Sequence, residues 1–121
     1  MKEWRPLAEQ GDADAQSMLG AMYSLGKGVP QDDKVAVKWF EKAAEQGDAG
    51  AQNQLGNMYD EGHGVSQSFI RAFMWWDIAA SLGNNDAKRK RGIIEEQMTP
   101  ADVLKAKQLA KECIAKVYKD C

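Results

Sequence analysis

The chain has 121 residues, of which 44% are hydrophobic and 28% are charged, and its formal net charge at pH 7 is -2. This is the size and composition of one globular domain with a modest core. The small net charge gives no general attraction to nucleic acid or to anionic membranes, and no apolar run approaches the ~20 residues that a membrane-spanning helix needs.

Residues 2–10 are predicted to form the first helix, and no helix precedes it on which Trp4 and Leu7 could pack. We therefore expect that the sequence begins partway through a longer array. We expect a monomer, although an exposed N-terminal helix could drive self-association.

An internal repeat follows. Residues 8–16 read AEQGDADAQ and residues 44–52 read AEQGDAGAQ, so eight of nine residues are identical. An ungapped alignment of residues 8–43 with 44–79 has 19 identities in 36 positions, and a weaker third copy continues through Ala80, Gly83 and Ala87. A period of this length is typical of stacked helical units.

Each full repeat is predicted to be a hairpin of an A helix and a B helix. In the first repeat, Ala15, Leu19 and Tyr23 form the apolar stripe of an A helix over 14–25, and Gly26 begins the turn that ends it. The stripe around Trp39 predicts a B helix over 32–46. The offset of 36 places the second pair at 50–61 and 67–82. Each hairpin leaves apolar surface that the next one covers.

Two glycines, Gly20 and Gly56, lie inside the predicted A helices, where glycine costs about 1 kcal/mol relative to alanine. We expect a close helix contact to offset this cost, with Ala15 and Ala36 on facing turns and aromatic side chains in the wider gaps. The aromatic residues expected in the core are Tyr23, Trp39, Tyr59, Trp75 and Trp76.

The last unit is predicted to comprise helices over 85–97 and 100–119. Thr99 is a suitable N-cap for the final helix, and Pro100 and Asp102 suit its first turn. The KRKR run at 88–91 could be a nucleic-acid patch, but we favour a solvated surface on which Arg91 pairs with Glu95 one turn further on.

The two cysteines, Cys113 and Cys121, are eight residues apart. On one continuous helix they would be separated by about 12 Å, beyond the ~7 Å limit on Cα separation for a disulfide. They can bond only if the helix ends early. Otherwise we expect Cys113 to be a small buried residue on a packing face with Leu109, Ala110 and Val117.

No residue set indicates catalysis. His63 is the only histidine, which excludes a metal site built on several imidazoles, and its Gly-His-Gly turn favours a solvated side chain. The G-x-G pairs at 26–28 and 62–64 follow helices and lack the third glycine of a nucleotide-binding loop. We therefore predict no catalytic residue, no metal and no cofactor.

The repeated pattern resembles the Sel-1-like repeat, a relative of the tetratricopeptide repeat. The matching residues of the first copy are Ala15, Leu19, Gly20, Tyr23, Gly26, Gly28, Val29, Ala36, Trp39, Ala43, Ala44 and Gly47, and the second copy matches again from Ala51 to Gly83. Ala87, Arg91 and the Met-Thr-Pro of 98–100 resemble the terminal capping segment of many bacterial members. In that third unit Arg91 replaces the family's leucine and Glu95 its tyrosine.

The resemblance implies an all-α fold, an α/α superhelix that forms one solenoid domain over residues 1–121. Its parts are a partial repeat at 2–10, full repeats at 11–46 and 47–82, and a degenerate repeat with a C-terminal cap at 83–121. Many bacterial relatives act in the cell envelope, so the resemblance also implies a periplasmic or secreted location, with the cytoplasm as the alternative. The N-terminal sequence MKEWRPLAEQ has no apolar region typical of a signal peptide.

In the resembling repeats, the partner-binding positions lie in a concave groove lined by the A helices, two before, two after and five after the A-helix leucine. Carried over to this chain, they are Ser17, Ala21, Ser24, Asn53, Asn57, Asp60, Arg89, Ile93 and Glu96. Asn53 and Asn57 are one turn apart, so we expect both amides to project into the groove and bind the backbone of an extended peptide.

The function implied is that of a non-catalytic module, an adaptor or scaffold, which binds a protein or peptide partner and neither binds nucleic acid nor inserts into a membrane. The alternative is a cell-envelope hydrolase, or a protein that binds β-lactams or peptidoglycan.

Overall fold

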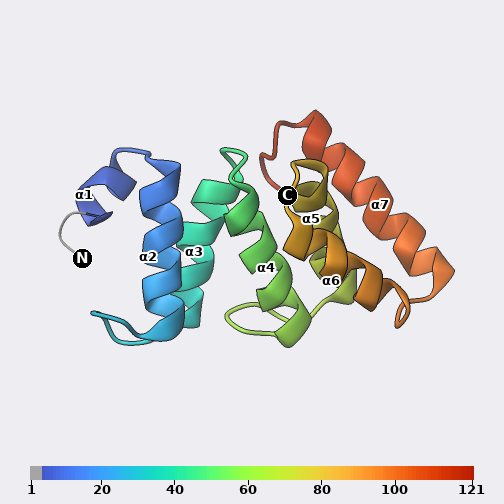
Figure 1. Cartoon of the computed structure of the whole chain (residues 1–121), viewed down its shortest axis with the longest axis horizontal. Coiled ribbons are helices and arrows are strands. Elements are labelled where there is room, and N and C mark those ends of the chain that lie inside the picture. The colour runs from blue at the N-terminus through green and yellow to red at the C-terminus, as the bar shows by residue number, and fades with distance from the viewer. Residues whose placement is uncertain (1–3) are drawn as a thin grey trace.

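The structure of the protein is a computed structural model that describes residues 4–121 (Figure 1). All of the regular elements in that range are helices, which confirms the predicted all-α class. They are α1 (Trp4–Glu9), α2 (Ala13–Leu25), α3 (Asp33–Ala44), α4 (Ala49–Glu61), α5 (Phe69–Ser81), α6 (Asn85–Glu95) and α7 (Pro100–Ala115).

The helices follow one another along the long axis of the molecule, from α1 at one end to α6 and α7 at the other (Figure 1). Each helix from α1 to α5 contacts the next one in the chain, and α7 packs on α5. The A helices of the two full repeats are α2 and α4, and their B helices are α3 and α5. This is the predicted solenoid of stacked hairpins.

The starts of α2 to α7 share one local feature, an N-cap side chain that accepts a hydrogen bond from a backbone N–H in the first turn. In both full repeats an aspartate caps the A helix: Asp12 accepts from the Ala15 N–H and Asp48 from the Ala51 N–H. The A helices end at Gly26 and Gly62, whose φ angles of 70° and 73° lie in the left-handed region that favours glycine. Repeated caps therefore set the repeated boundaries.

The two A-helix glycines do have close contacts, but the contact is different from the one expected. A Cβ added to Gly20 would lie 2.7 Å from the Phe40 ring, and one added to Gly56 would overlap the Trp76 indole. Each glycine thus forms a notch that an aromatic ring of the B helix fills, and the facing alanines are not the main contact. Of the tryptophans expected in the core, Trp75 and Trp76 are buried, whereas Trp39 is half-buried.

At the N-terminal end, the helix predicted at 2–10 is described from Trp4 to Glu9 as α1. Residues 2 and 3, and the predicted packing of the Trp4 side chain, lie outside the described residues. Ala8 is buried against Ala15 and Leu19, while Leu7 is exposed.

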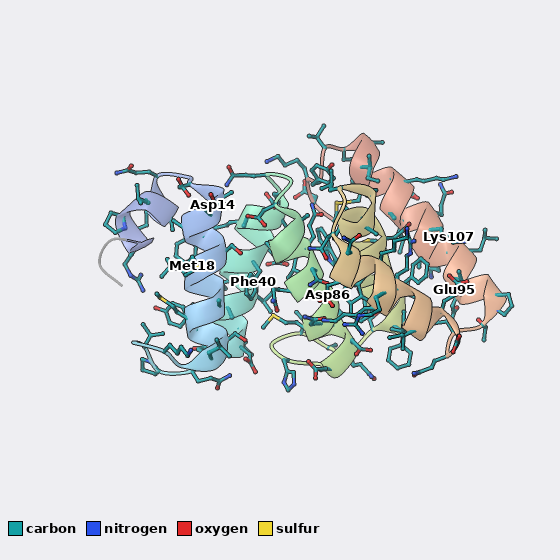
Figure 2. All side chains as sticks on the ribbon, in the orientation of Figure 1. Asp14, Met18, Phe40, Asp86, Glu95 and Lys107 are labelled. Atoms are coloured by element: carbon teal, nitrogen blue, oxygen red, sulfur yellow. A yellow bond between two sulfur atoms is a disulfide. The ribbon has the colours of Figure 1, made fainter. Side chains whose placement is uncertain are left out.

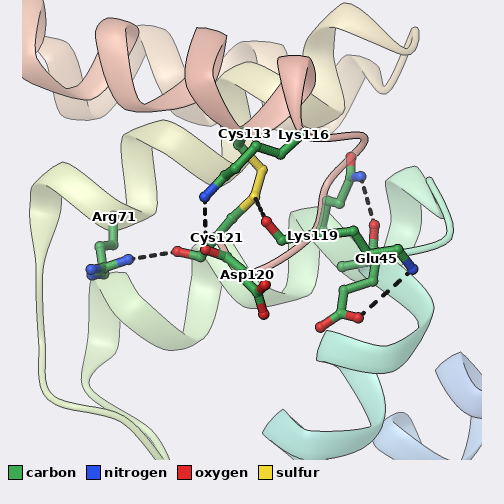
Figure 3. The surroundings of a disulfide bond; sticks show 9 residues. Glu45, Arg71, Cys113, Lys116, Lys119, Asp120 and Cys121 are labelled. Atoms are coloured by element: carbon green, nitrogen blue, oxygen red, sulfur yellow. Dashed lines mark hydrogen bonds and ion pairs between the residues drawn. A yellow bond between two sulfur atoms is a disulfide. The ribbon is translucent and has the colours of Figure 1, made fainter.

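The prediction of a continuous helix over 100–119 was wrong, because α7 ends at Ala115. Val117, Tyr118 and Asp120 then adopt positive φ angles of 54°, 66° and 53°, so the chain reverses. The reversal brings the Cα atoms of Cys113 and Cys121 to 5.5 Å, and the two cysteines form a disulfide (Figure 3). Val117, expected on the packing face, is 65% exposed.

We call residues 116–121 the C-terminal tail. The tail lies against the B helices of both repeats: Arg71 of α5 donates to the Cys121 carbonyl at 2.8 Å, and the Lys119 ammonium lies 4.0 Å from the Glu45 carboxylate (Figure 3). The Tyr118 ring packs beside Gly47. The tail therefore connects α7 to the junction between the two full repeats.

Candidate functional site

We call the surface formed by the A helices α2 and α4 and by α6, the first helix of the cap, the A-helix face. Two hollows on this face adjoin the C-terminal turn of α4. The first, the α4–α6 cleft, has a volume of about 300 Å³. Its lining includes Asn57, Asp60 and Glu61 of α4, Trp76 of α5, and Lys90 and Ile93 of α6.

The second hollow, the α2–α4 hollow, has a volume of about 270 Å³ and lies between the two full repeats. Ser24 of α2 lines it, together with Asn57 and Glu61, so the two hollows meet at these α4 residues. His63 also lines it, and its ring Nδ1 lies 3.6 Å from the Asp33 carboxylate at the start of α3. The histidine turn is exposed as predicted, but it also contacts the preceding repeat.

Four of the nine predicted groove residues therefore line the two hollows. They are Ser24, Asn57, Asp60 and Ile93. Ser17 and Ala21 are half-buried on α2, and Arg89 and Glu96 are exposed on or just after α6, but none of these four lines either hollow. The structure thus brings these four residues together around the end of α4, and the other predicted groove residues lie outside the two hollows.

The prediction that Asn53 projects into the groove beside Asn57 was wrong. Asn53 is only 7% exposed, and its amide nitrogen donates to the Asp86 carboxylate at 3.0 Å. Its side chain therefore joins α4 to α6 and is not available to a peptide. Asn57 does reach the cleft, where its Oδ1 accepts from the Lys90 ammonium at 2.7 Å.

Asp86 is the centre of a polar network that the sequence analysis missed. It lies at the start of α6, beside α4 (Figure 2). Its carboxylate accepts from Asn53, from Arg89 at 2.6 Å and from Lys90 at 3.1 Å. The hydrogen bond from Asn53, followed by those from Arg89 and Lys90, holds the pKa of Asp86 well below its ordinary value of 3.8. The ionised carboxylate therefore joins the second repeat to the cap.

The basic run at 88–91 has a structural role that its sequence obscures. Arg89 and Lys90 pair with Asp86, and Arg91 donates to Asp77 of α5 at 2.7 Å. The expected pairing of Arg91 with Glu95 was therefore wrong, because the Arg91 side chain turns toward α5. The sequence does contain one pattern that indicates these ion pairs, the spacing of Arg89 and Lys90 three and four residues after Asp86.

The carboxylates of the α4–α6 cleft lack the ion pairs that the Asp86 carboxylate makes. Among residues 4–121, neither Asp60 nor Glu61 has a basic group within ion-pair distance. Burial and the neighbouring Glu61 raise the pKa of Asp60, and the positive charge of Lys90 opposes them in part. The cleft thus offers hydrogen-bonding amides, two acidic groups and the exposed apolar side chain of Ile93.

Within the described part of the chain, no three His, Cys, Asp or Glu side chains are grouped in a way that could hold a metal ion. None of the helices described is both long and apolar enough to span a bilayer.

Solved structures of similar fold include two bacterial proteins. The chain superposes on a protective antigen of uropathogenic Escherichia coli strains that displays an SLR fold, with a TM-score of 0.89 and 34% identity over 95% of this chain. It spans 26% of that antigen. A Sel1 repeat protein from Oxalobacter formigenes gives a TM-score of 0.72 and 39% identity, covering 74% of this chain and 67% of the other. No curated protein sequence matches.

The Sel1 repeat matches residues 13–48 and 49–84, each of which holds one A helix and one B helix. These units begin two residues later than the repeats predicted at 11–46 and 47–82. Sel1 repeats generally mediate protein–protein interactions and are generally not catalytic. Because the two matched units cover more than half of the chain, the protein belongs to the Sel1 repeat family.

Proposed function

We propose that this protein is a non-catalytic adaptor that binds a segment of a partner protein on its A-helix face. The observation that carries the proposal is that the α4–α6 cleft and the α2–α4 hollow meet at Asn57 and Glu61. A segment that crosses the last turns of α4 would contact both hollows. Hollows lined by several helices can bind more of a ligand than a flat helix face can.

Asn57 is well placed to bind the backbone of such a segment. Its Oδ1 is bound to Lys90, but its amide nitrogen has only a long contact of 3.4 Å with the Gln54 side chain. A partner carbonyl could replace this weak bond with a shorter one. Loss of the donor would then leave the partner's carbonyl without a partner as it is desolvated, which costs about 1 to 3 kcal/mol.

The test is a display library of random peptides selected on the parent protein. The affinity of the best binder is then measured for the parent, for Asn57→Ala and for Gln108→Ala, a matched amide loss at an exposed position on α7. We expect Asn57→Ala to weaken binding about tenfold or more, Gln108→Ala to have no effect, and melting temperatures to change little. Equal affinity for all three proteins at equal stability would place the site elsewhere, on the B-helix side or on the turns.

We further propose that the protein works in an oxidising compartment, the periplasm or the cell exterior. The disulfide between Cys113 and Cys121 supports this location, because such bonds persist mainly outside the reducing cytosol. Alkylation of free thiols in intact source cells, before and after reduction, tests it. Two free thiols in untreated cells would favour the cytoplasm.

A further inference from the structure

The α4–α6 cleft contains one positive charge that is already paired and two negative charges that have no ion-pair partner among residues 4–121. The Lys90 ammonium is already bound to the Asn57 amide oxygen at 2.7 Å and to the Asp86 carboxylate at 3.1 Å. Asp60 and Glu61 have no such partner among residues 4–121, and burial together with their mutual repulsion raises the pKa of Asp60. The wall of the cleft on α4 is therefore electronegative.

The position of the two carboxylates strengthens this potential. Both lie in the last turn of α4, which ends at Glu61 with Gly62 as its C-cap. The C-terminal end of a helix carries a partial negative charge, which attracts cations and disfavours anions. The carboxylates and the helix end therefore act in the same direction.

The opposite wall, on and just after α6, presents the apolar side chain of Ile93 beside Lys90 and Gln97. Ile93 is 51% exposed although it is hydrophobic, and the buried Trp76 also lines the cleft. Lys and Arg side chains combine an apolar stem of several methylenes with a cationic head, and they lay the stem along apolar surface while the head reaches a charged group. The cleft has the two surfaces that such a side chain needs.

We propose that the α4–α6 cleft binds a Lys or Arg side chain of the partner segment, with the stem against Ile93 and the cation between Asp60 and Glu61. This inference rests on the proposed function and adds the chemistry of the partner. The selectivity belongs to the second repeat, because the equivalent positions of the first repeat are Ser24 and Leu25, which carry no charge.

The experiment uses three capped pentapeptides, acetyl-Gly-Ala-X-Ala-Gly-amide, with lysine, norleucine or glutamate at X. Each is titrated into the ¹⁵N-labelled protein while the Trp76 indole and Asn57 side-chain resonances are followed. We expect the lysine peptide to bind about tenfold more tightly than the norleucine peptide, and the glutamate peptide to bind most weakly. The preference should shrink as salt is added.

Two double variants separate the cleft from net charge. Asp60→Asn with Glu61→Gln should remove the preference for lysine over norleucine. Glu9→Gln with Glu112→Gln, which makes the same change in net charge at exposed positions on α1 and α7, should keep it.

The inference is overturned if the lysine and norleucine peptides bind equally, if the glutamate peptide is preferred, or if none of the three shifts the cleft resonances. Those results do not affect the wider proposal if peptides selected from the library still depend on Asn57. A library that yields no Asn57-dependent binder would instead contradict the proposed function itself.

Discussion

Trp39 and Trp75 occupy equivalent positions of the two full repeats, 36 residues apart, yet their surroundings differ. Trp75 is 4% exposed because it lies in the central core, with Tyr118 and Cys121 of the C-terminal tail packed against that core. Trp39 has no such cover and is half-buried, with the Lys42 ammonium 6.0 Å from its ring centre. The same residue in the same repeat position is thus core or surface according to its neighbours.

The glycine turns show the same difference. A Cβ added to Gly64 would lie 2.5 Å from the Asp33 carbonyl, because the turn of the second repeat presses on the start of α3. A Cβ added to Gly28, its equivalent in the first repeat, would meet nothing within 4 Å. Inter-repeat contacts, rather than the repeat sequence alone, therefore decide how much each repeated position contributes to stability.

The largest expected effect comes from filling the two helix notches. Gly56→Leu should lower the free energy of unfolding by about 3 kcal/mol, and Gly20→Leu by about 2 kcal/mol, because a branched side chain cannot share space with the ring above it. The second repeat should lose more, since displacing Trp76 also breaks the 3.1 Å bond from its indole N–H to the Asn53 carbonyl. Urea unfolding measures both values. Equal losses would mean that the indole bond adds nothing.

Removal of the disulfide should expose Trp75 of the second repeat, as Trp39 of the first repeat already is in part. Cys121→Ser opens a short loop, and loop-closure entropy predicts a loss of about 2 to 3 kcal/mol. Three non-glycine residues in left-handed conformations also favour release of the tail once the bond is absent. The Trp75 indole N–H should then exchange with solvent faster, as followed by NMR. Reduction of the disulfide in the parent protein should reproduce the effect. An unchanged exchange rate of the Trp75 indole N–H would show that the tail is held without the disulfide.

A smaller effect is expected at the junction between the second repeat and the cap. Asp86→Ala should cost about 1 to 2 kcal/mol at pH 7, because Asn53 and Lys90 lose their shared acceptor. The equivalent pair at the junction between the first and second repeats is Ser17 with Gly50, which cannot make this bond.

The contribution of Asp86 to the free energy of unfolding should decrease as the pH falls. Its pKa is lowered in the folded state, so its stabilisation is complete above the unfolded value near 4 and is lost as the pH falls below that value. The difference in unfolding free energy between the parent and Asp86→Ala should therefore narrow between pH 5 and about pH 2. A difference that stays constant across this range would rule out the ionised carboxylate as its source.

The hairpin fold was predictable from the sequence because its signals are local. Caps such as Asp48 and stops such as Gly62 recur with the repeat, and the predicted helix ends fall within two residues of the observed ones in both full repeats. The early end of α7 was not predictable, since Val117 and Tyr118 have no intrinsic preference for the left-handed region. They lie in a tail that is held by contacts distant in sequence, from Arg71 to the Cys121 carbonyl and from Glu45 to Lys119.

The candidate site was predictable in part for the same reason. Helical spacing placed Asn57 and Asp60 on one side of α4, and the structure puts both in one cleft. The burial of Asn53 depends on Asp86, which lies 33 residues away on another helix. The pattern within α4 carries no information on how closely α6 approaches.

One buried glutamine in each repeat makes the closest comparison. Gln16 and Gln52 both donate to a backbone carbonyl of the preceding B-helix end, Ala8 at 3.0 Å and Ala44 at 3.2 Å. In the first repeat the Gln16 Oε1 also accepts from the Gln46 side chain at 2.8 Å. In the second repeat the Gln52 Oε1 is buried without a hydrogen-bond partner. The residue equivalent to Gln46 is there Leu82, which cannot donate.

Leu82→Gln should therefore stabilise the protein, by about 0.5 to 1 kcal/mol, because it supplies the missing donor to a buried acceptor and removes an exposed leucine. The reciprocal change, Gln46→Leu, should destabilise it by about 1 kcal/mol, since Gln16 then loses the bond that Gln52 already lacks. Urea midpoints of the two single variants and of the double variant measure both effects, which should be close to additive because they act on separate glutamines. If Leu82→Gln has no effect or destabilises the protein while Gln46→Leu destabilises as expected, the two repeats differ in backbone geometry at this position and not merely in the side chain they carry.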